Sequence, residues 1–125
     1  MSDITAYQTQ GYEKLTVYRK SFELVIIIYE ITKKFPKEEL FVLVPQIRRA
    51  AISVVANIVE GYSKISRKEL IRFLEISKGS VNELELFFKV SYKLQYFDKI
   101  KFEEIISLIT EVKKLLYGYQ KSLRK

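Results

Sequence analysis

The chain lacks cysteine, histidine and tryptophan, and its 125 residues include only 4 glycines and 2 prolines. Without cysteine there can be no disulfide or thiol chemistry. Without histidine as well, Cys/His zinc sites and catalytic triads with an imidazole base are excluded. A metal site made of carboxylates alone stays open. Few glycines and prolines disfavour an all-β fold, which needs many tight turns. We therefore expect a helical, non-enzymatic domain with no cofactor and no metal.

Long hydrophobic runs are missing too. The longest, Leu24 to Tyr29, is far too short to span a bilayer. The stretch from Met1 to Gly11 is polar and contains neither lysine nor arginine, so we expect no signal peptide. The lack of cysteine fits a cytosolic protein. We predict a cytoplasmic protein with no membrane association.

Positive charge is in excess, with 22 Lys and Arg against 15 Asp and Glu, a formal net charge of +7. This balance favours an anionic partner such as nucleic acid or a membrane surface. The alternative is that lysines simply cover the solvated faces of helices. Charge alone does not separate the two interpretations.

Hydrophobic side chains recur every three or four residues, which predicts an all-α fold. We expect a tail at residues 1–12 and one domain at residues 13–125, with helices at about 15–34, 45–60, 67–95 and 99–123. The β-branched run Val25 to Ile28 also fits a strand, but helical spacing continues on both flanks. Short connections favour an antiparallel up-down-up-down four-helix bundle. Surplus apolar faces on the first two helices predict a homo-oligomer.

Several residues mark the expected helix ends. Phe35-Pro36 ends the first helix, and a short helical turn is expected at Lys37 to Leu43. Pro45 suits the first turn of the second helix but would kink a helix that began earlier. Gly61 is expected just past the end of that helix, at the position that favours glycine. Ser66 with Glu69 forms a capping box for the third helix, and Asp98 caps the fourth.

The segment from Gln46 to Gly61 is apolar almost all round except for one polar thread. The thread comprises Gln46, Arg49, Ser53, Asn57 and Glu60. Arg49 is expected to pair with a carboxylate, either Glu60, Glu83 or one from a neighbouring subunit, with phosphate contact as the alternative. Asn57 and Glu60 are expected to fix the helix end by hydrogen bonds, with a ligand site as the alternative.

The third helix carries two further structural candidates. Gly79-Ser80 lies in its middle, where a close approach of another helix would explain a glycine that otherwise costs about 1 kcal/mol relative to alanine. A tolerated accident is the alternative. Glu83 is a candidate partner for the polar thread or an ordinary solvated residue.

The main nucleic-acid-binding candidates are Lys64, Arg67, Lys68 and Arg72, which cluster at the start of the third helix. Backbone N–H groups at a helix start also favour anions. Tyr62 lies beside them and can stack on a base or pack on an arginine. Arg48, which points about 100° away from Arg49, is a further candidate. A solvated face is the alternative, and it is preferred for the C-terminal basic residues Lys113, Lys114, Lys121, Arg124 and Lys125.

Three motifs together resemble one protein family. They are QIRRAAIS at residues 46–53, NIVEG at 57–61 and FLEISKGSVNE at 73–83, preceded by Phe35-Pro36. The chain resembles, over about residues 12–120, the four-helix-bundle proteins encoded within intervening sequences of bacterial large-subunit ribosomal RNA genes. It departs from the usual pattern at Pro45 and at Val54-Val55, which puts the start or bend of the second helix in doubt.

The resemblance implies an antiparallel bundle that assembles into a ring, with a homopentamer favoured and no established enzymatic activity. A related branch, the accessory variability proteins of diversity-generating retroelements, binds nucleic acid and partners a reverse transcriptase. We therefore expect an oligomer that binds structured RNA or DNA through a basic surface and works with a nucleic-acid-processing protein. The alternative is a protein–protein adaptor or scaffold without nucleic-acid contact.

Overall fold

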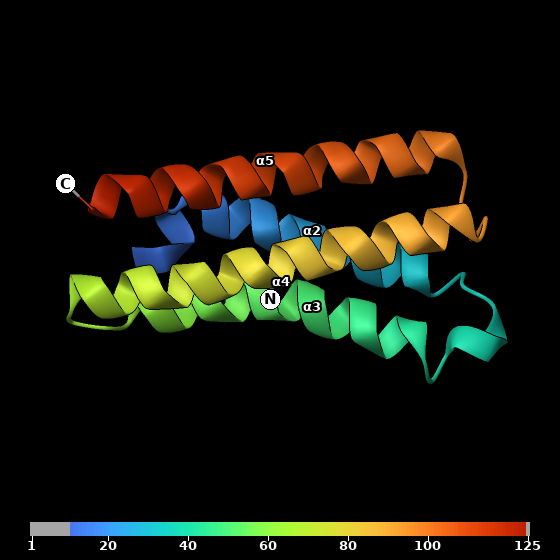
Figure 1. Ribbon diagram of the computed structural model, residues 1–125, viewed down its shortest axis with the longest axis horizontal. Helices are drawn as coiled ribbons and strands as arrows, with labels where there is room; N and C mark the ends of the chain where they lie inside the picture. The colour runs from blue at the N-terminus through green and yellow to red at the C-terminus, as the bar shows by residue number, and fades with distance from the viewer. Residues whose placement is uncertain (1–10, 125) are drawn as a thin grey trace, which may run out of the picture.

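Four long α-helices make up the protein. The computed structural model describes residues 11–124 and contains no strand in that range (Figure 1). The described part begins with a 3-10 turn, and its elements are η1 (Gly11–Lys14), α2 (Thr16–Thr32), η2 (Lys37–Glu39), α3 (Leu43–Tyr62), α4 (Arg67–Lys93) and α5 (Lys99–Leu123). The all-α prediction is thus confirmed. The β-branched run Val25 to Ile28 lies inside α2 and not in a strand.

Local chemistry accounts for most helix ends. The Ser66 side chain accepts a hydrogen bond from the backbone N–H of Glu69, and the Asp98 side chain accepts one from that of Lys101. These caps satisfy N–H groups that the first turn of a helix leaves open. Pro45 is the third residue of α3, so it lies in the first turn, where its missing N–H costs little. The caps at Ser66 and Asp98 and the position of Pro45 are therefore confirmed, but the return bond from the Ser66 N–H to the Glu69 carboxylate, which completes a capping box, is absent among residues 11–124.

Gly61 corrects one prediction. It does not follow α3 as a terminating residue but lies within the helix, which continues to Tyr62. A Cβ added to Gly61 would lie 2.9 Å from Phe73 Cβ and 3.0 Å from Leu70 Cδ1. The glycine is therefore needed because α4 packs closely against this turn of α3, and not for a left-handed backbone.

Gly79 corrects a second prediction. No atom of another helix lies within 4 Å of a Cβ built on this residue, so the close helix approach expected there does not occur among residues 11–124. The tail expected at residues 1–12 falls mostly outside the described residues. Its last two, Gly11 and Tyr12, belong to η1, and the Tyr12 ring packs against Tyr18 at 5.0 Å.

The packing of the helices defines the sides of the molecule. Helix α3 packs mainly against α2 and α4, and α5 packs mainly against the same two. The α2–α3 pair and the α4–α5 pair therefore form opposite sides, and Figure 1 shows all four helices extended along one axis. Every helix in residues 11–124 carries too little continuous apolar sequence to traverse a bilayer.

The core runs along the axis between the four helices. Its largest fully buried apolar side chains are Phe88, Leu24, Ile28, Ile47, Ile58, Leu74, Leu84, Ile105, Ile109, Leu116 and Val54. Each is worth roughly 1.5–3 kcal/mol relative to an exposed position. Phe88 also stacks at 4.5 Å on Phe97, which closes the end of the core beside the α4–α5 connection. This core holds the surfaces described next in fixed positions.

Candidate nucleic-acid interface

The basic cluster predicted at the start of α4 is brought together by the turn between α3 and α4. Arg67, Lys68 and Arg72 lie in the first two turns of α4, and Lys64 lies in the preceding loop. Lys64 and Arg72 are each paired with a glutamate. Lys64 Nζ is 3.2 Å from Glu60, and Arg72 Nε is 3.4 Å from Glu69. Lys68 is exposed and has no ion-pair partner among the described residues.

The aromatic residue that contacts this cluster is Phe73, which the sequence did not single out. The Lys64 ammonium lies 5.3 Å from the Phe73 ring centroid, and the Arg72 guanidinium carbon lies 4.8 Å from it. Tyr62 instead meets the ring of Tyr12 at 6.3 Å in an edge-on arrangement. The spacing of Phe73 one residue after Arg72 was the only signal for this contact.

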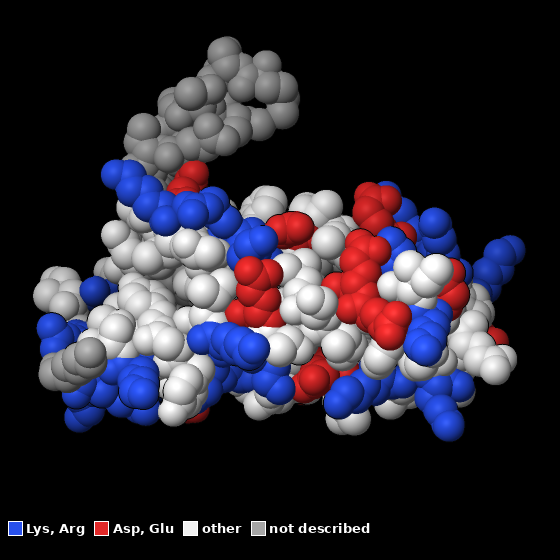
Figure 2. Space-filling model, turned by 90° about the horizontal axis from the view of Figure 1, so that it is seen from above, with Lys and Arg blue, Asp and Glu red and all other residues white. Residues whose placement is uncertain are grey.

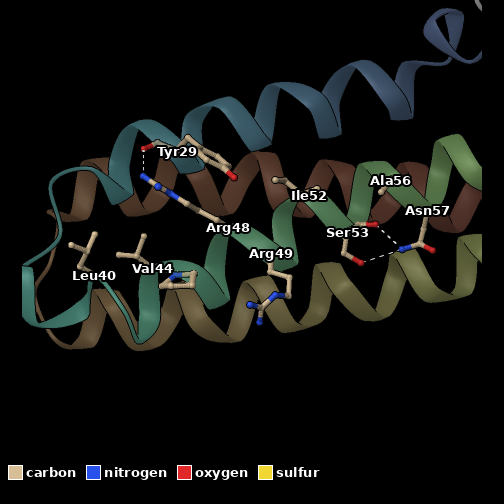
Figure 3. Close-up of a pocket in the computed structure, with 10 residues that line it drawn as sticks. Tyr29, Leu40, Val44, Arg48, Arg49, Ile52, Ser53, Ala56 and Asn57 are labelled. Atoms are coloured by element: carbon tan, nitrogen blue, oxygen red, sulfur yellow. Dashed lines mark hydrogen bonds between the residues drawn. The ribbon is translucent and has the colours of Figure 1, made fainter.

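Arg48 lies apart from the cluster, on the side of α3 that faces α2. Its Nε donates to Thr32 Oγ1 at 2.9 Å, and its guanidinium carbon lies 4.4 Å from the centroid of the Tyr29 ring. Figure 3 shows Arg48 reaching toward α2 while Arg49 points the other way. From Arg48 to Tyr62, at the end of α3, the helix rises about 20 Å. Arg48 therefore joins two helices and is not part of the surface around the α3–α4 turn.

The middle of the polar thread connects α3 to α4. The hydroxyls of Ser53 and Ser80 are 2.7 Å apart, and the Asn57 amide donates to the Ser53 carbonyl at 2.8 Å. Nearby, the buried Ser77 hydroxyl donates to the Val54 carbonyl at 2.7 Å. Sequence analysis picked out Ser53, Asn57 and Ser80 but missed Ser77. Its position one helical turn before Ser80 was the available signal.

The two charged residues expected to pair near this seam do not do so within the chain. Arg49 and Glu83 are both exposed, and neither has a hydrogen bond or ion pair with a described residue. Glu60, another expected partner of Arg49, pairs with Lys64 instead. Gln46 at the start of the thread is also exposed. Of the alternatives for Arg49, a carboxylate on another copy of the chain and a phosphate are the two still open.

An apolar groove of about 660 Å³ lies between α2 and α3 (Figure 3). Its lining includes Tyr29, Leu40, Pro45, Ile52 and Ala56. On α4, the exposed hydrophobic side chains are Ile76, Leu86 and Val90, and Leu94 follows directly after the helix. The surplus apolar surface expected on the second helix is therefore present, and it extends onto α4, which was not expected.

Two carboxylates of α4 are held in their ionised form by hydrogen bonds. Hydrogen bonds from Gln120 and Lys78 lower the pKa of Glu75, and a hydrogen bond from Lys113 lowers that of Glu85. Both shifts favour the ionised carboxylate and not a proton donor. Within residues 11–124, no group of three or more acidic side chains is placed to hold a metal ion.

Basic side chains also gather away from the α3–α4 turn. In the view from above, they predominate along the lower edge of the molecule, while most acidic side chains of that face lie above them (Figure 2). Lys78 of α4 lines a hollow between α4 and α5 together with Lys113 and Lys114. The sequence analysis treated the two α5 lysines as solvated residues, because their distance from Lys78 along the chain hid this arrangement.

Comparisons with known proteins agree with this architecture. The family model described as 23S rRNA-intervening sequence protein matches residues 13–118. A crystal structure of a protein of unknown function from the S23 ribosomal protein family of Bacteroides thetaiotaomicron is similar at a TM-score of 0.77 and 30% identity, covering 85% of this chain and 99% of that one. No curated protein matched the chain. Since the family model covers most of the sequence and the related structure shares the fold, the chain belongs to the 23S rRNA-intervening sequence protein family.

Proposed function

We propose that this protein is a non-enzymatic, cytoplasmic four-helix protein that self-associates and binds structured RNA or DNA through the basic surface at the α3–α4 turn. In this proposal the helices form an antiparallel up-down-up-down bundle, and copies of the bundle assemble into a ring, with a pentamer favoured by the family resemblance. A nucleic-acid-processing protein is the expected further partner. The bound nucleic acid would be recognised mainly by its phosphates.

The observation that carries nucleic-acid binding is the exposed cationic turn on a chain of net charge +7. Arg67 and Lys68 are exposed there, and Lys64 and Arg72 flank the ring of Phe73. Lysine and arginine that neutralise phosphates release bound counterions, which gives affinity without sequence preference. The ion pairs of Lys64 and Arg72 are exposed, so they are weak enough to exchange for a phosphate partner.

Exposed apolar surface on α3 and α4 supports self-association. Ile52, Ile76 and Leu86 are each more than two-fifths exposed, and the space over Gly79 is open. Apolar patches of this kind are typical of protein interfaces. Arg49 and Glu83 lie among them without partners in the described chain. Arg49 of one copy is suited to meet Glu83 of the next, because opposite charges steer and align associating surfaces.

The nucleic-acid proposal is tested by measuring RNA affinity against salt concentration. We expect affinity to fall steeply as salt rises, and the triple substitution Arg67→Ser, Lys68→Ser and Arg72→Ser to weaken binding across sequences and flatten the slope by about 2. The control replaces Lys33, Lys34 and Lys37 by serine. It removes the same amount of positive charge, but just after the end of α2 and not at the α3–α4 turn. Absence of binding at about 50 mM salt, or equal losses in the two triple variants, would refute the proposal.

Self-association is tested by light scattering at micromolar concentration. Arg49→Glu and Glu83→Arg should each reduce the molar mass, and the double variant should restore it if the two residues meet across an interface. A monomeric wild-type protein would overturn this part of the proposal. The adaptor alternative would be supported by two results together. The protein would bind no RNA, and it would capture a partner protein equally well before and after nuclease treatment.

A further inference from the structure

A shallow hollow between α4 and α5 brings together lysines from two helices and one exposed aromatic ring. It has a volume of about 350 Å³ and is lined by Lys78, Asn82, Lys113, Lys114 and Tyr117. This volume lies at the small end of the roughly 300–1,000 Å³ that is usual for ligand sites. The lining contains three lysines and no acidic residue. An anion of modest size is the ligand that this composition favours.

Two of the lysines are held in place by groups at the margin. Lys78 Nζ donates to Gln120 Oε1 at 2.9 Å and lies 3.4 Å from Glu75. Lys113 Nζ donates to Glu85 Oε1 at 2.9 Å. Gln120 is itself buried and donates to the Ile71 carbonyl at 3.2 Å, so its position is fixed by the helix packing. Side chains held this way lose less conformational freedom when they bind a ligand.

The third lysine and the aromatic ring remain available. Lys114 is exposed and has no ion-pair partner in the described part of the chain. Tyr117 is 59% exposed, and the Lys78 ammonium lies 5.6 Å from its ring centroid. Asn82 adds an exposed amide, which can both donate and accept hydrogen bonds. Positive charge, an aromatic face and an amide are thus adjacent at one hollow.

We propose that this hollow, which we call the α4–α5 groove, binds a nucleotide of single-stranded nucleic acid, with its phosphate at the lysines and its base stacked on Tyr117. An acidic peptide would use the lysines but would have no need of the aromatic face. Duplex bases are stacked on each other, whereas unpaired bases are free to stack on an aromatic side chain. The inference rests on the nucleic-acid binding proposed above and adds a second site and a preference for unpaired strands.

The position of the groove fits this role. Lys78 follows Arg67 by eleven residues, which is three helical turns and about 16 Å, so both lie on the same face of α4. A strand bound at the α3–α4 turn can therefore continue along α4 into the groove. The groove lies on the side of the bundle opposite the apolar α2–α3 groove. Both grooves are accessible at the same time.

The experiment measures affinities for a labelled single-stranded oligonucleotide, its duplex and an abasic strand of the same length. We expect the wild-type protein to prefer the single strand. Tyr117→Leu should weaken single-strand binding about fivefold to 100-fold, while leaving duplex and abasic binding unchanged. Tyr117→Phe should bind like the wild type because it keeps the aromatic face. Phe41→Leu, which removes an exposed ring outside both basic surfaces, is the matched control, and thermal unfolding of each variant checks that it is folded.

A second measurement probes the lysines and the location. Lys114→Gln should flatten the dependence of log affinity on log salt by about 0.7 for the single strand. Photocrosslinking with a 5-iodouridine strand should label Tyr117. The groove proposal would be overturned if the wild type and Tyr117→Leu had equal affinity for the single strand, or if crosslinks were confined to the α3–α4 turn. Either result would leave the proposal of nucleic-acid binding itself intact.

Two other outcomes would also overturn the groove proposal. Competition by a free nucleoside monophosphate at micromolar concentration would assign the groove to a free nucleotide. No binding of any oligonucleotide by the wild type would remove the proposed function itself.

Discussion

The two opposite sides of the bundle both place a cationic side chain beside a tyrosine ring, but the two pairs differ in their surroundings. On the α2–α3 side, Arg48 lies 4.4 Å from the Tyr29 ring and also donates to the buried hydroxyl of Thr32. On the α4–α5 side, Lys78 lies 5.6 Å from the ring of Tyr117, which is mostly exposed. A cation beside a tyrosine therefore has no fixed meaning. The solvent exposure of the tyrosine ring decides whether the pair joins two helices or is available to a ligand.

The surroundings of the two pairs differ in the same way. The α2–α3 groove is lined mainly by apolar side chains such as Ile52 and Ala56 beside two arginines, whereas the α4–α5 groove contains three lysines and a single aromatic ring. The first surface suits another protein surface and the second an anion. The two sides are tied together by Tyr96, next to α5, whose hydroxyl donates to Glu39 between α2 and α3 at 2.6 Å.

The largest expected effect comes from removing the buried support of the α4–α5 side. Gln120→Ala removes hydrogen bonds to Lys78 and the Ile71 carbonyl and leaves a cavity beside α4. We expect a loss of about 2–4 kcal/mol in the free energy of unfolding, measured by urea titration. Exposed Ser122→Ala is the control and should change stability by less than about 0.5 kcal/mol. Equal stability of the two variants would show that Gln120 does not support this side.

A smaller effect distinguishes the neighbouring arginines of α3. Arg48→Met removes the bond to Thr32 and the contact with Tyr29, and should cost about 1–2 kcal/mol of unfolding free energy. Arg49→Met removes no contact within the described chain and should change it by less than about 0.5 kcal/mol in the monomer. Urea unfolding at low protein concentration measures both. The reverse order would contradict the structural role assigned to Arg48.

The link between the two sides should respond to alkaline pH. The hydrogen bond to Glu39 raises the pKa of Tyr96 to about 12 from its ordinary value of 10.0. Because the folded-state pKa is higher, the contribution of Tyr96 is fully present below pH 10 and is lost as pH rises toward 12. Tyr96→Phe should therefore be less stable than the wild type at pH 8, and the difference should shrink by pH 11. Urea midpoints at both pH values test this, and a constant difference would contradict it.

The smallest expected effect on stability comes from the pair of Lys113 and Glu85 beside the α4–α5 groove, and it should depend on acid pH. The hydrogen bond from Lys113 lowers the pKa of Glu85 below its ordinary value of 4.5. Since the folded-state pKa is lower, this stabilisation is present above pH 4.5 and is lost as pH falls through the folded-state pKa. Lys113→Gln should cost about 0.5 kcal/mol of unfolding free energy at pH 7 and less at pH 3. Thermal unfolding at both pH values measures it, and a cost that grows in acid would contradict the pairing.

Local sequence signals determined most of the fold. The Ser66 and Asp98 caps mark the starts of α4 and α5, and the residues predicted for the last helix, 99–123, match α5. These signals work because a cap and its helix turn are neighbours in the chain. The basic cluster from Lys64 to Arg72 was predictable for the same reason, since its members are close in sequence.

Tertiary packing decided what local signals could not. Helical spacing shows that Arg48 and Arg49 point apart, but only the position of α2 makes Arg48 the one that joins helices. Gly61 has the residue type of a helix end, yet it lies inside α3, where the close approach of Phe73 leaves no room for a side chain.

The α4–α5 groove joins Lys78 to Lys113 and Lys114, which lie more than thirty residues further along the chain. The sequence by itself determined where helices begin and which faces are apolar, because both follow from neighbouring residues. Which side chains meet across helices was decided only by the packed structure, because that depends on partners distant in the chain.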